Sequence, residues 1–426
     1  MIEFVLVSVF GLVVGILIGL MPMMPIYLGS FLMYFFLFDW QLQSLLIFWI
    51  ATLIGSQFFG SVAAITLGIP GESSSVVYVN QVRKLPLNQR AKLLWKTARG
   101  SHIAGFTAIV LVWLILTQFT GLHYLGNHWL KLFFYTFAIL VFMFMDRRPW
   151  VALLLIMFGL FLSPGNNLVL PEWYYKLQFV FQDITFYMVI MGLMILPEFM
   201  FATDKQPQCD YRKLPRPRHS IKDSIIYAKH TVVGLIAGCI PGPCADVASA
   251  VSFKTQKGDT KDKVVAAETA NNSACIFMLI PFFAIGVPIT MTSLIMANVL
   301  DIKGIEILQT FESQPHLLHQ IVGMAMLLNF VNYVLAVRFI SVYTTFLKFV
   351  QNKILSIQVI LVLALVIADI WMSEAQLTTY IPMMCATISL GCLLKFKRIN
   401  PIPLVFAMLL GDTLIWTYLQ TYYIIF

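Results

Sequence analysis

Acidic, hydroxyl and amide side chains lie directly beside glycine–proline breaks in this otherwise apolar chain. Glu72-Ser73-Ser74-Ser75 follows Pro70-Gly71 within a long apolar segment. Proline removes a helical hydrogen bond and glycine relaxes the backbone, so one helix should end here and another begin. The free N–H groups of the second helix and the serine hydroxyls could bind a carboxylate, or the serines could act only as helix caps. Glu72 is costly at membrane depth and is therefore a functional candidate, unless this loop reaches water.

A second group of polar residues suits a cation. Asp246 follows the break Pro241-Gly242-Pro243, and Asn271-Asn272 precede an apolar run that begins at Ala274. Amide and carboxylate oxygens, with unwound carbonyls beside Pro241 and Gly242, could form a small all-oxygen ion site. We expect Na⁺ rather than H⁺ as the coupling ion, because amides add coordination but hold no proton. The alternatives are that Asn271 or Asn272 caps a helix, and that Glu72 and Asp246 carry protons.

The composition places these breaks in a membrane. Of the 426 residues, 59% are hydrophobic and 11% are charged, and the mean hydropathy is +0.84. A soluble domain carries about 25% charged residues, so the chain is expected to be a polytopic membrane protein. The net charge of +8 does not indicate nucleic-acid binding, because the basic residues gather in loops between apolar segments. No Gly-x-x-x-x-Gly-Lys-Ser/Thr motif occurs, so a nucleotide is not the expected energy source.

The breaks occur twice. Gly15-x-x-x-Gly19, followed by Pro22, recurs as Gly234-x-x-x-Gly238, followed by Pro241, at an offset of 219 residues (234 minus 15). Gly68-Ile69-Pro70 recurs as Gly286-Val287-Pro288 at an offset of 218 residues (286 minus 68). Interrupted segments at matching positions of two halves point to a substrate site near the bilayer midplane. We therefore add Gly286 and Pro288 to the expected substrate-binding residues beside the first break, which are Pro70, Gly71, Glu72, Ser73, Ser74 and Ser75.

Two inverted repeats account for the distribution of charge. Each half is expected to hold a broken re-entrant hairpin, a broken helix and about four spanning helices. The expected elements are 4–37, 44–80, 101–118, 129–145, 150–163 and 184–202 in the first half, and 231–253, 264–300, 317–337, 354–372, 377–394 and 402–422 in the second. If successive segments cross the membrane in alternating directions, all lysines and arginines except Lys131, Lys176 and Lys303 lie on one side of it. The positive-inside rule makes this side cytoplasmic.

Equivalent loops of the two halves carry opposite charge, and this indicates that the second half is inverted relative to the first. The division is then a first repeat at 1–202, a basic cytoplasmic linker at 203–230 and a second repeat at 231–426. Both termini are expected to be periplasmic.

The ordered motifs resemble the large membrane subunit of the tripartite tricarboxylate transporters, a TctA-like permease, in a shortened and divergent form. The matching segments are Ile69-Pro70-Gly71, Pro241-Gly242, Glu268-Thr269-Ala270-Asn271-Asn272, Ile280-Pro281, Gly286-Val287-Pro288 and Pro403 to Asp412. Three positions depart from the family pattern: the glycine usual after Pro22 is missing, Glu72-Ser73 replaces Thr-Pro, and Ile289 replaces a glycine. The resemblance implies ion-coupled uptake of a di- or tricarboxylate, with a periplasmic solute-binding protein and a small membrane subunit as partners.

The sequence therefore predicts an all-α, inverted-repeat secondary transporter in the lipid bilayer of a bacterial inner membrane. Its expected substrate is a small organic anion, it is not expected to be an enzyme, and it needs no cofactor besides the coupling ion. Two alternatives stay open: a polytopic membrane enzyme that acts on a lipid or isoprenoid, and an inactive transporter relative. The enzyme would need Asp, His and Arg side chains clustered at a membrane face.

Overall fold

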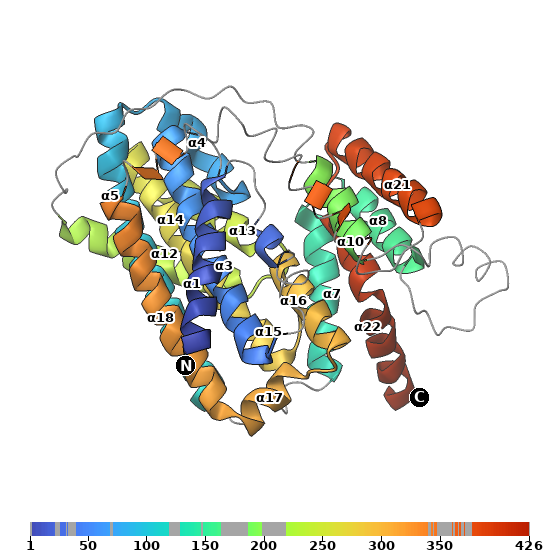
Figure 1. The fold of residues 1–426 in the computed structure, drawn as a ribbon. Coiled ribbons are helices and arrows are strands. Elements are labelled where there is room, and N and C mark those ends of the chain that lie inside the picture. The colour runs from blue at the N-terminus through green and yellow to red at the C-terminus, as the bar shows by residue number, and fades with distance from the viewer. Residues whose placement is uncertain are drawn as a thin grey trace. The chain divides into compact units, whose positions relative to one another are not determined.

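Helices make up the whole of the regular structure that is described, and no strand occurs among these residues (Figure 1). The structure, a computed structural model, describes residues 2–21, 26–30, 40–68, 71–118, 128–145, 148–162, 186–197, 219–339 and 377–425, with a few further residues at 32, within 342–346 and within 360–370. The predicted all-α class is confirmed. Parts of the expected elements 4–37 and 184–202, and most of 354–372, lie outside the described residues.

The described helices belong to two compact units, and each unit combines a piece of both sequence halves. One unit is Met1–Leu125 with Asp204–Lys353, and the other is Gly126–Thr203 with Ile354–Phe426. These units do not test the predicted division into two repeats and a linker, at 1–202, 203–230 and 231–426, because that division follows the sequence repeat and not the packing of helices. The division stays a prediction.

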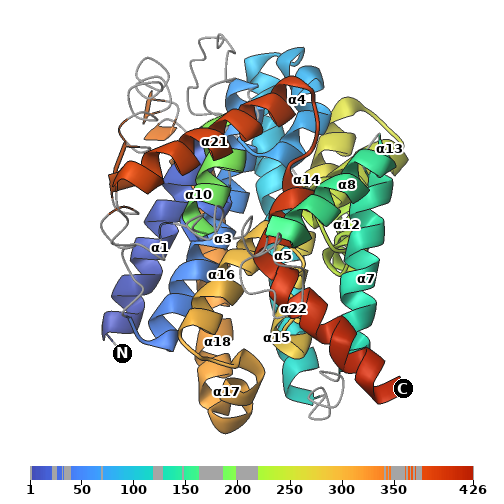
Figure 2. The same ribbon diagram turned by 90° about the vertical axis from the view of Figure 1, so that its right-hand side faces the viewer.

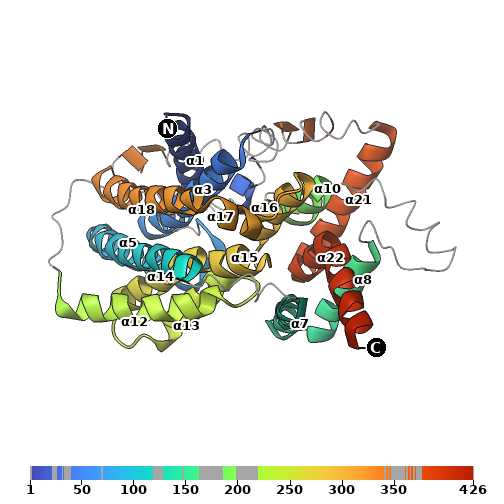
Figure 3. The ribbon, with the colours of Figure 1, turned by 90° about the horizontal axis from the view of Figure 1, so that it is seen from below.

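The first unit holds all the sequence breaks. It contains α1 (Ile2–Leu20), α3 (Leu42–Leu67), the 3-10 turn η1 (Ser73–Ser75), α4 (Val76–Arg83), α5 (Leu87–Gln118), α12 (Ile221–Gly238), α13 (Cys244–Thr255), α14 (Thr260–Phe277), α15 (Leu279–Ile285), α16 (Met291–Ile302), α17 (Ile307–Ser313) and α18 (Pro315–Arg338). Seen from below, α18, α5, α14 and α12 lie side by side in this order (Figure 3). The helix α1 packs along α3.

The second unit is built from shorter pieces of both halves. It contains α7 (His128–Met145), α8 (Pro149–Leu162), α10 (Phe186–Ile190), the π-helical turn η2 (Met191–Ile195), α21 (Leu377–Phe396) and α22 (Ile402–Ile425), which can be followed in Figure 2. The helix α22 packs against α7 and α8, and α21 packs against η2. A Cβ atom at Gly159 would lie 2.6 Å from the carbonyl oxygen of Leu404, so α8 and α22 approach each other closely through this glycine.

Six of the described helices are long and apolar enough to cross a membrane. The candidate spans are Glu3–Leu20, Leu42–Thr66, Asn88–Gln118, Thr260–Ile285, Pro315–Arg338 and Leu377–Phe396. A spanning helix needs about 20 apolar residues, and these segments meet that length. The chain is therefore a multi-pass membrane protein.

The repeated Gly-x-x-x-Gly motifs form close helix contacts in the first unit. Cβ atoms at Gly15 and Gly19 of α1 would lie 2.5 Å from carbonyl oxygens of α3. In the same way, Gly234 and Gly238 of α12 face the carbonyl oxygens of Ala270 and Ala274 on α14. Small residues allow membrane helices to pack with their backbones in contact, and here the repeated motif makes the same kind of contact twice.

Two helices begin well before their expected apolar spans, at Leu87 rather than 101 and at Ile221 rather than 231. The early start of α12 has a local cause, since Ser220 and Asp223 form a capping box that can begin a helix in charged sequence. His219 lies four residues before Asp223, with 3.9 Å between its Nδ1 and the Asp223 Oδ2 atom, and Lys96 donates to the other carboxylate oxygen at 2.7 Å. This cluster stabilises the start of a helix, and the last part of the expected linker is thus helical.

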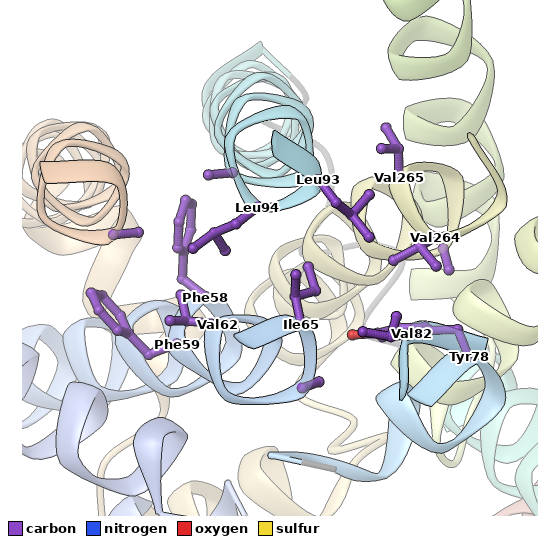
Figure 4. Close-up of a cluster of buried hydrophobic side chains, with 14 of the residues drawn as sticks. Phe58, Phe59, Val62, Ile65, Tyr78, Val82, Leu93, Leu94, Val264 and Val265 are labelled. Atoms are coloured by element: carbon purple, nitrogen blue, oxygen red, sulfur yellow. The ribbon is translucent and has the colours of Figure 1, made fainter. Parts of the chain in front are cut away.

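A cluster of buried apolar side chains holds the short helix α4 in place (Figure 4). The contributing side chains are Phe58, Phe59, Val62 and Ile65 from α3, Tyr78 and Val82 from α4, Leu93 and Leu94 from α5, and Val264 and Val265 from α14. Because α4 is only eight residues long, this packing rather than its own helix propensity must fix its position. The segment that joins α3 to α4 contains Glu72 and is positioned by both helices.

Candidate functional site

The first Gly-x-Pro break ends α3 as the sequence predicts. Gly68 adopts the left-handed conformation, with φ 70° and ψ 33°, and its N–H donates to the Ala64 carbonyl at 3.0 Å. The Arg83 Nε atom donates to the Gly68 carbonyl at 2.6 Å, and the Arg90 Nη1 atom donates to the Thr66 carbonyl at 3.3 Å. These guanidinium groups satisfy carbonyls that the helix end leaves free. Ile69 and Pro70 lie outside the described residues.

Glu72 follows the break and points into the protein. Its side chain is 6% exposed, and its Oε1 atom accepts a hydrogen bond of 2.7 Å from the Asn271 amide. The absence of side chains at Gly60 and Gly71 creates the space, since a Cβ at Gly71 would overlap the Gly60 carbonyl oxygen and one at Gly60 would press on Glu72. The alternative that Glu72 sits on a loop that reaches water is therefore wrong.

The serines after Glu72 do not act as helix caps through their side chains. Ser73–Ser75 form η1, and Ser75, at the N-cap of α4, makes no side-chain capping bond. Instead, the Ser75 hydroxyl donates to the Glu72 carbonyl at 2.7 Å. Ser74 and Ser75 are buried and Ser73 is exposed. The alternative in which these serines only cap a helix is thus wrong.

Asn271 and Asn272 lie in the middle of α14 and not at its start. The N-cap of α14 is Asp259, whose side chain accepts from the Asp262 N–H, so the alternative that an asparagine caps this helix is wrong. The Asn272 amide nitrogen donates to the Ser101 hydroxyl at 2.9 Å and to the Glu268 carbonyl at 3.0 Å. The two amides therefore face different partners, Glu72 for Asn271 and α5 for Asn272.

Glu268 is a second buried carboxylate, one turn before Asn271 on the same helix. It is fully buried, and the Tyr78 hydroxyl of α4 donates to its Oε1 atom. The sequence indicates Glu268 only as part of a family motif, and nothing in it indicates Tyr78 or Ser101. The signal for Tyr78 would have been a polar group on the buried face of a helix, but eight residues are too few for a periodic pattern.

The breaks of the second half contact each other directly. Gly286 is left-handed, with φ 74° and ψ 20°, and ends α15 with its N–H on the Phe282 carbonyl at 3.0 Å. The Gly242 N–H donates to the Ile289 carbonyl at 2.7 Å, which joins the break at 241–243 to the break at 286–288. Pro241, Gly242 and Pro288 are buried.

Two hydrogen bonds connect the first break to the second half. The Ser73 hydroxyl donates to the Asp246 Oδ1 atom at 2.8 Å, and the Ser249 hydroxyl donates to the Ser74 carbonyl at 3.0 Å. Together with the bond from Asn271 to Glu72, they bring segments 71–75, 244–249 and 268–272 to one place. The break at 286–288 adjoins it through Gly242. The geometry therefore unites the predicted site residues that are described, while their roles in binding stay predictions.

The ionisable side chains that meet in this region are acidic. No ion pair involves Glu72, Asp246 or Glu268 within the described part of the chain. No group of three or more His, Cys, Asp or Glu side chains that could hold a metal ion occurs among the residues searched, which are the described ones. A pocket between α3, α5, α14, α15 and α18 is lined only by apolar side chains, so it offers a carboxylate no hydrogen bond.

A family model described as the Tripartite tricarboxylate transporter TctA family matches residues 5–406 of the 426. No curated protein and no solved structure matches the chain.

Proposed function

The chain belongs to the tripartite tricarboxylate transporter TctA family, and from this premise we propose that it is a permease subunit for ion-coupled uptake of a small di- or tricarboxylate. The family is one of membrane transporters, which argues against the membrane enzyme as an alternative. Transport would be secondary active, driven by an ion gradient. The inverted repeat, the periplasmic termini and the bacterial inner membrane are part of the same proposal.

One observation carries this proposal: helix breaks from both sequence halves meet around buried acidic and hydroxyl groups. Ser73 bonds to Asp246, and Asn271 bonds to Glu72, so residues some 170 to 200 positions apart share one site. Half-helix ends at such a site can bind an anionic substrate through N–H groups and a cation through carbonyl oxygens. A structural role alone would not require buried acids without cationic partners, which are costly at membrane depth.

We assign the substrate to the hydroxyl-bearing and N–H-bearing ends of the broken helices. The candidates are Pro70, Gly71, Ser73, Ser74, Ser75, Gly286 and Pro288. Support comes from α16, which starts after the second break with buried Thr292 and Ser293 in its first turn. The positive end of such a helix favours a carboxylate. Glu72 moves from the substrate group to the ion group, because it bonds inward to Asn271.

Two further proteins should work with this subunit. The family is tripartite, so we propose a small membrane subunit and a periplasmic solute-binding protein that delivers the anion. Sodium is the proposed coupling ion, and Pro241, Gly242, Asp246, Asn271 and Asn272 are its ligand candidates from the sequence.

Reconstitution tests the proposal. The chain, with the small membrane subunit and the binding protein encoded beside it, is placed in proteoliposomes and offered radiolabelled di- and tricarboxylates. We expect saturable uptake of at least one of them, abolished when the Na⁺ gradient is collapsed with an ionophore. Uptake that persists without any ion gradient would overturn secondary transport, and no uptake of any carboxylate would overturn the substrate class.

A further inference from the structure

We propose that Glu72, Glu268 and Asn271 form a binding site for a single Na⁺ ion, separate from the side chains of Asp246 and Asn272. The proposal deepens the proposed function, since it names the coupling-ion site. It rests on three buried oxygen atoms that no described group satisfies, and on the charge that surrounds them.

The three oxygens belong to side chains that are already held in place by their other polar atoms. Glu72 uses Oε1 to accept from Asn271, Glu268 uses Oε1 to accept from Tyr78, and Asn271 uses its nitrogen as the donor. The remaining atoms, Oε2 of Glu72, Oε2 of Glu268 and Oδ1 of Asn271, are buried and accept no hydrogen bond of normal geometry within the described residues, although the Ser74 hydroxyl lies near Glu72 and the Ser61 hydroxyl and the Asn271 amide lie near Glu268. Exposure of the three side chains is 6%, 0% and 0%. Buried polar atoms are nearly always satisfied, so these three call for an occupant.

All three atoms are acceptors, and this restricts what the occupant can be. A ligand that satisfies them must be electropositive, so a carboxylate substrate is excluded from this position. A single proton, whether it is shared by the two carboxyl groups or donated from one of them to the Asn271 amide oxygen, would join only two of the three atoms and leave the third without a partner. A metal cation, by contrast, can be bound by several oxygens at once.

The charge around the site leads to the same ion. The carboxyl groups of Glu72 and Glu268 interact electrostatically, and Asp246, Tyr78 and Cys275 are the other titratable groups near them. None of these groups is a cation at neutral pH, so two buried carboxylates face each other without compensation. One Na⁺ offsets part of this charge, and the hydrogen bonds from Tyr78 and Asn271 disperse the rest.

The supply of oxygens favours a monovalent ion. Beside the three unsatisfied atoms, the hydroxyls of Ser74 and Ser61 neighbour Glu72 and Glu268. Ca²⁺ takes six to eight oxygen ligands as a rule, which is about twice what the unsatisfied atoms provide. Asn272 and Asp246 lie apart from these atoms, because the Asn272 amide group faces Ser101 of α5 and Asp246 is bonded to Ser73 on a less buried side.

The site lies next to the proposed substrate residues and explains how the ion and the anion could be coupled. Glu72 directly precedes Ser73–Ser75, whose positions depend on η1 and on the bond from Ser249 to Ser74. A cation that draws Glu72 toward Glu268 fixes this segment. Without the cation, repulsion between the carboxylates displaces it. Binding of Na⁺ and of the substrate should then strengthen each other equally, as linkage requires.

The test measures ion binding by the purified full-length chain without any substrate. Thermal unfolding in detergent is followed while NaCl replaces choline chloride at constant ionic strength, and equilibrium binding of radioactive Na⁺ gives the Kd. Because a ligand that binds only the folded state stabilises it, the Tm should rise with Na⁺ and reach saturation. Glu72→Gln, Glu268→Gln and Asn271→Ala should each raise the Kd at least tenfold. Asp223→Asn, which changes a buried carboxylate elsewhere, should leave the Kd within twofold.

Each other outcome overturns the site. A Glu72→Gln protein that folds and retains the wild-type Kd excludes Glu72 as a ligand, and loss of binding in Asp246→Asn alone would move the ion to Asp246. Stabilisation by lower pH in choline chloride, with no response to Na⁺, would show that Glu72 and Glu268 bind a proton instead of Na⁺. Stabilisation by micromolar Ca²⁺ would assign it to a divalent ion. Since the readout needs no substrate, Na⁺ binding without carboxylate uptake would refute the proposed function and leave the site intact.

Discussion

Gly68 and Gly286 occupy matching positions in the two sequence halves, and both end a helix with φ near 70°. Beyond the glycine the two breaks differ. The first break is followed by a buried carboxylate, that of Glu72. The Gly68 carbonyl at this break accepts a hydrogen bond from Arg83. The second is followed by a capping box of Thr290 and Ser293 and by uncharged residues. One backbone geometry thus serves an acidic environment in the first half and a neutral, donor-rich environment in the second.

The difference suggests a division of labour between the breaks. A carboxylate in a buried position attracts a cation, whereas hydroxyls and the N-terminus of α16 favour an anion. The sequence repeat supplies two similar helix ends, and a few substitutions beside them are enough to give each a different ligand. The following changes test this comparison.

The largest effect is expected at the acid of the first break. Glu72→Gln should lower Na⁺-driven uptake about 100-fold, because it removes the carboxylate charge that pairs with the proposed buried Na⁺, a loss of about 2–5 kcal/mol. The measurement is initial uptake rate in proteoliposomes. Asp301→Asn, which changes an exposed acid at the end of α16 beyond the second break, is the matched control and should retain uptake within about threefold. Equal losses in both variants would contradict the comparison.

Replacing each of the two left-handed glycines with alanine should lower the stability of the protein by different amounts. A left-handed conformation costs a residue with a Cβ about 1–2 kcal/mol, and this cost applies to Gly68→Ala and Gly286→Ala alike. At Gly68 the Cβ would also lie 2.8 Å from the Cγ atom of Arg83, whereas at Gly286 it meets nothing within 4 Å. We therefore expect Gly68→Ala to lower the free energy of unfolding by about 1 kcal/mol more than Gly286→Ala. Unfolding in mixed detergent micelles measures both, and a larger loss at Gly286 would be inconsistent with the structure.

The cap of α16 should matter to a smaller extent. Thr290→Ala removes the side-chain acceptor for the Ser293 N–H, and it should cost about 1 kcal/mol. Thr290→Asn keeps a good N-cap and should restore most of this stability. The same unfolding assay applies, and failure of asparagine to restore stability would show that the hydroxyl acts otherwise than as a cap.

The smallest effect concerns pH and a region away from both breaks. Burial raises the pKa of Asp223, but the hydrogen bond from Lys96 and those at Ser220 outweigh it and hold the pKa below its usual value. A lowered folded-state pKa contributes stability above the unfolded value, about 3.9, and this contribution is lost as the pH falls through the folded value. Unfolding measured from pH 7 to pH 3 should therefore show a smaller acid-induced loss in Asp223→Asn than in the wild type. An identical pH profile of stability in Asp223→Asn and in the wild type would contradict this role of Asp223.

Local sequence signals predicted the positions of the helices more accurately than they predicted the contacts between side chains. Left-handed glycines, helix breaks and apolar runs act over a few residues, so the ends of α3 and α15 and the bounds of the helices α7 and α8 were predicted within a few residues. The start of α12 in charged sequence was missed, because capping at Ser220 rather than apolarity sets it. The contacts of Glu268 with Tyr78 and of Asn272 with Ser101 join positions 190 and 171 residues apart, and no local pattern encodes them.

The interleaved order of the two units has a consequence for biosynthesis. The second unit needs 126–203 and 354–426, with α8 resting on α22 and η2 on α21, yet 204–353 belongs to the first unit. A ribosome that adds about 5–20 residues per second needs roughly 8–30 s for that stretch. During this time α7 and α8 lack the partner α22 against which they later pack. Completion of the second unit therefore has to wait for the last helix of the chain to be inserted.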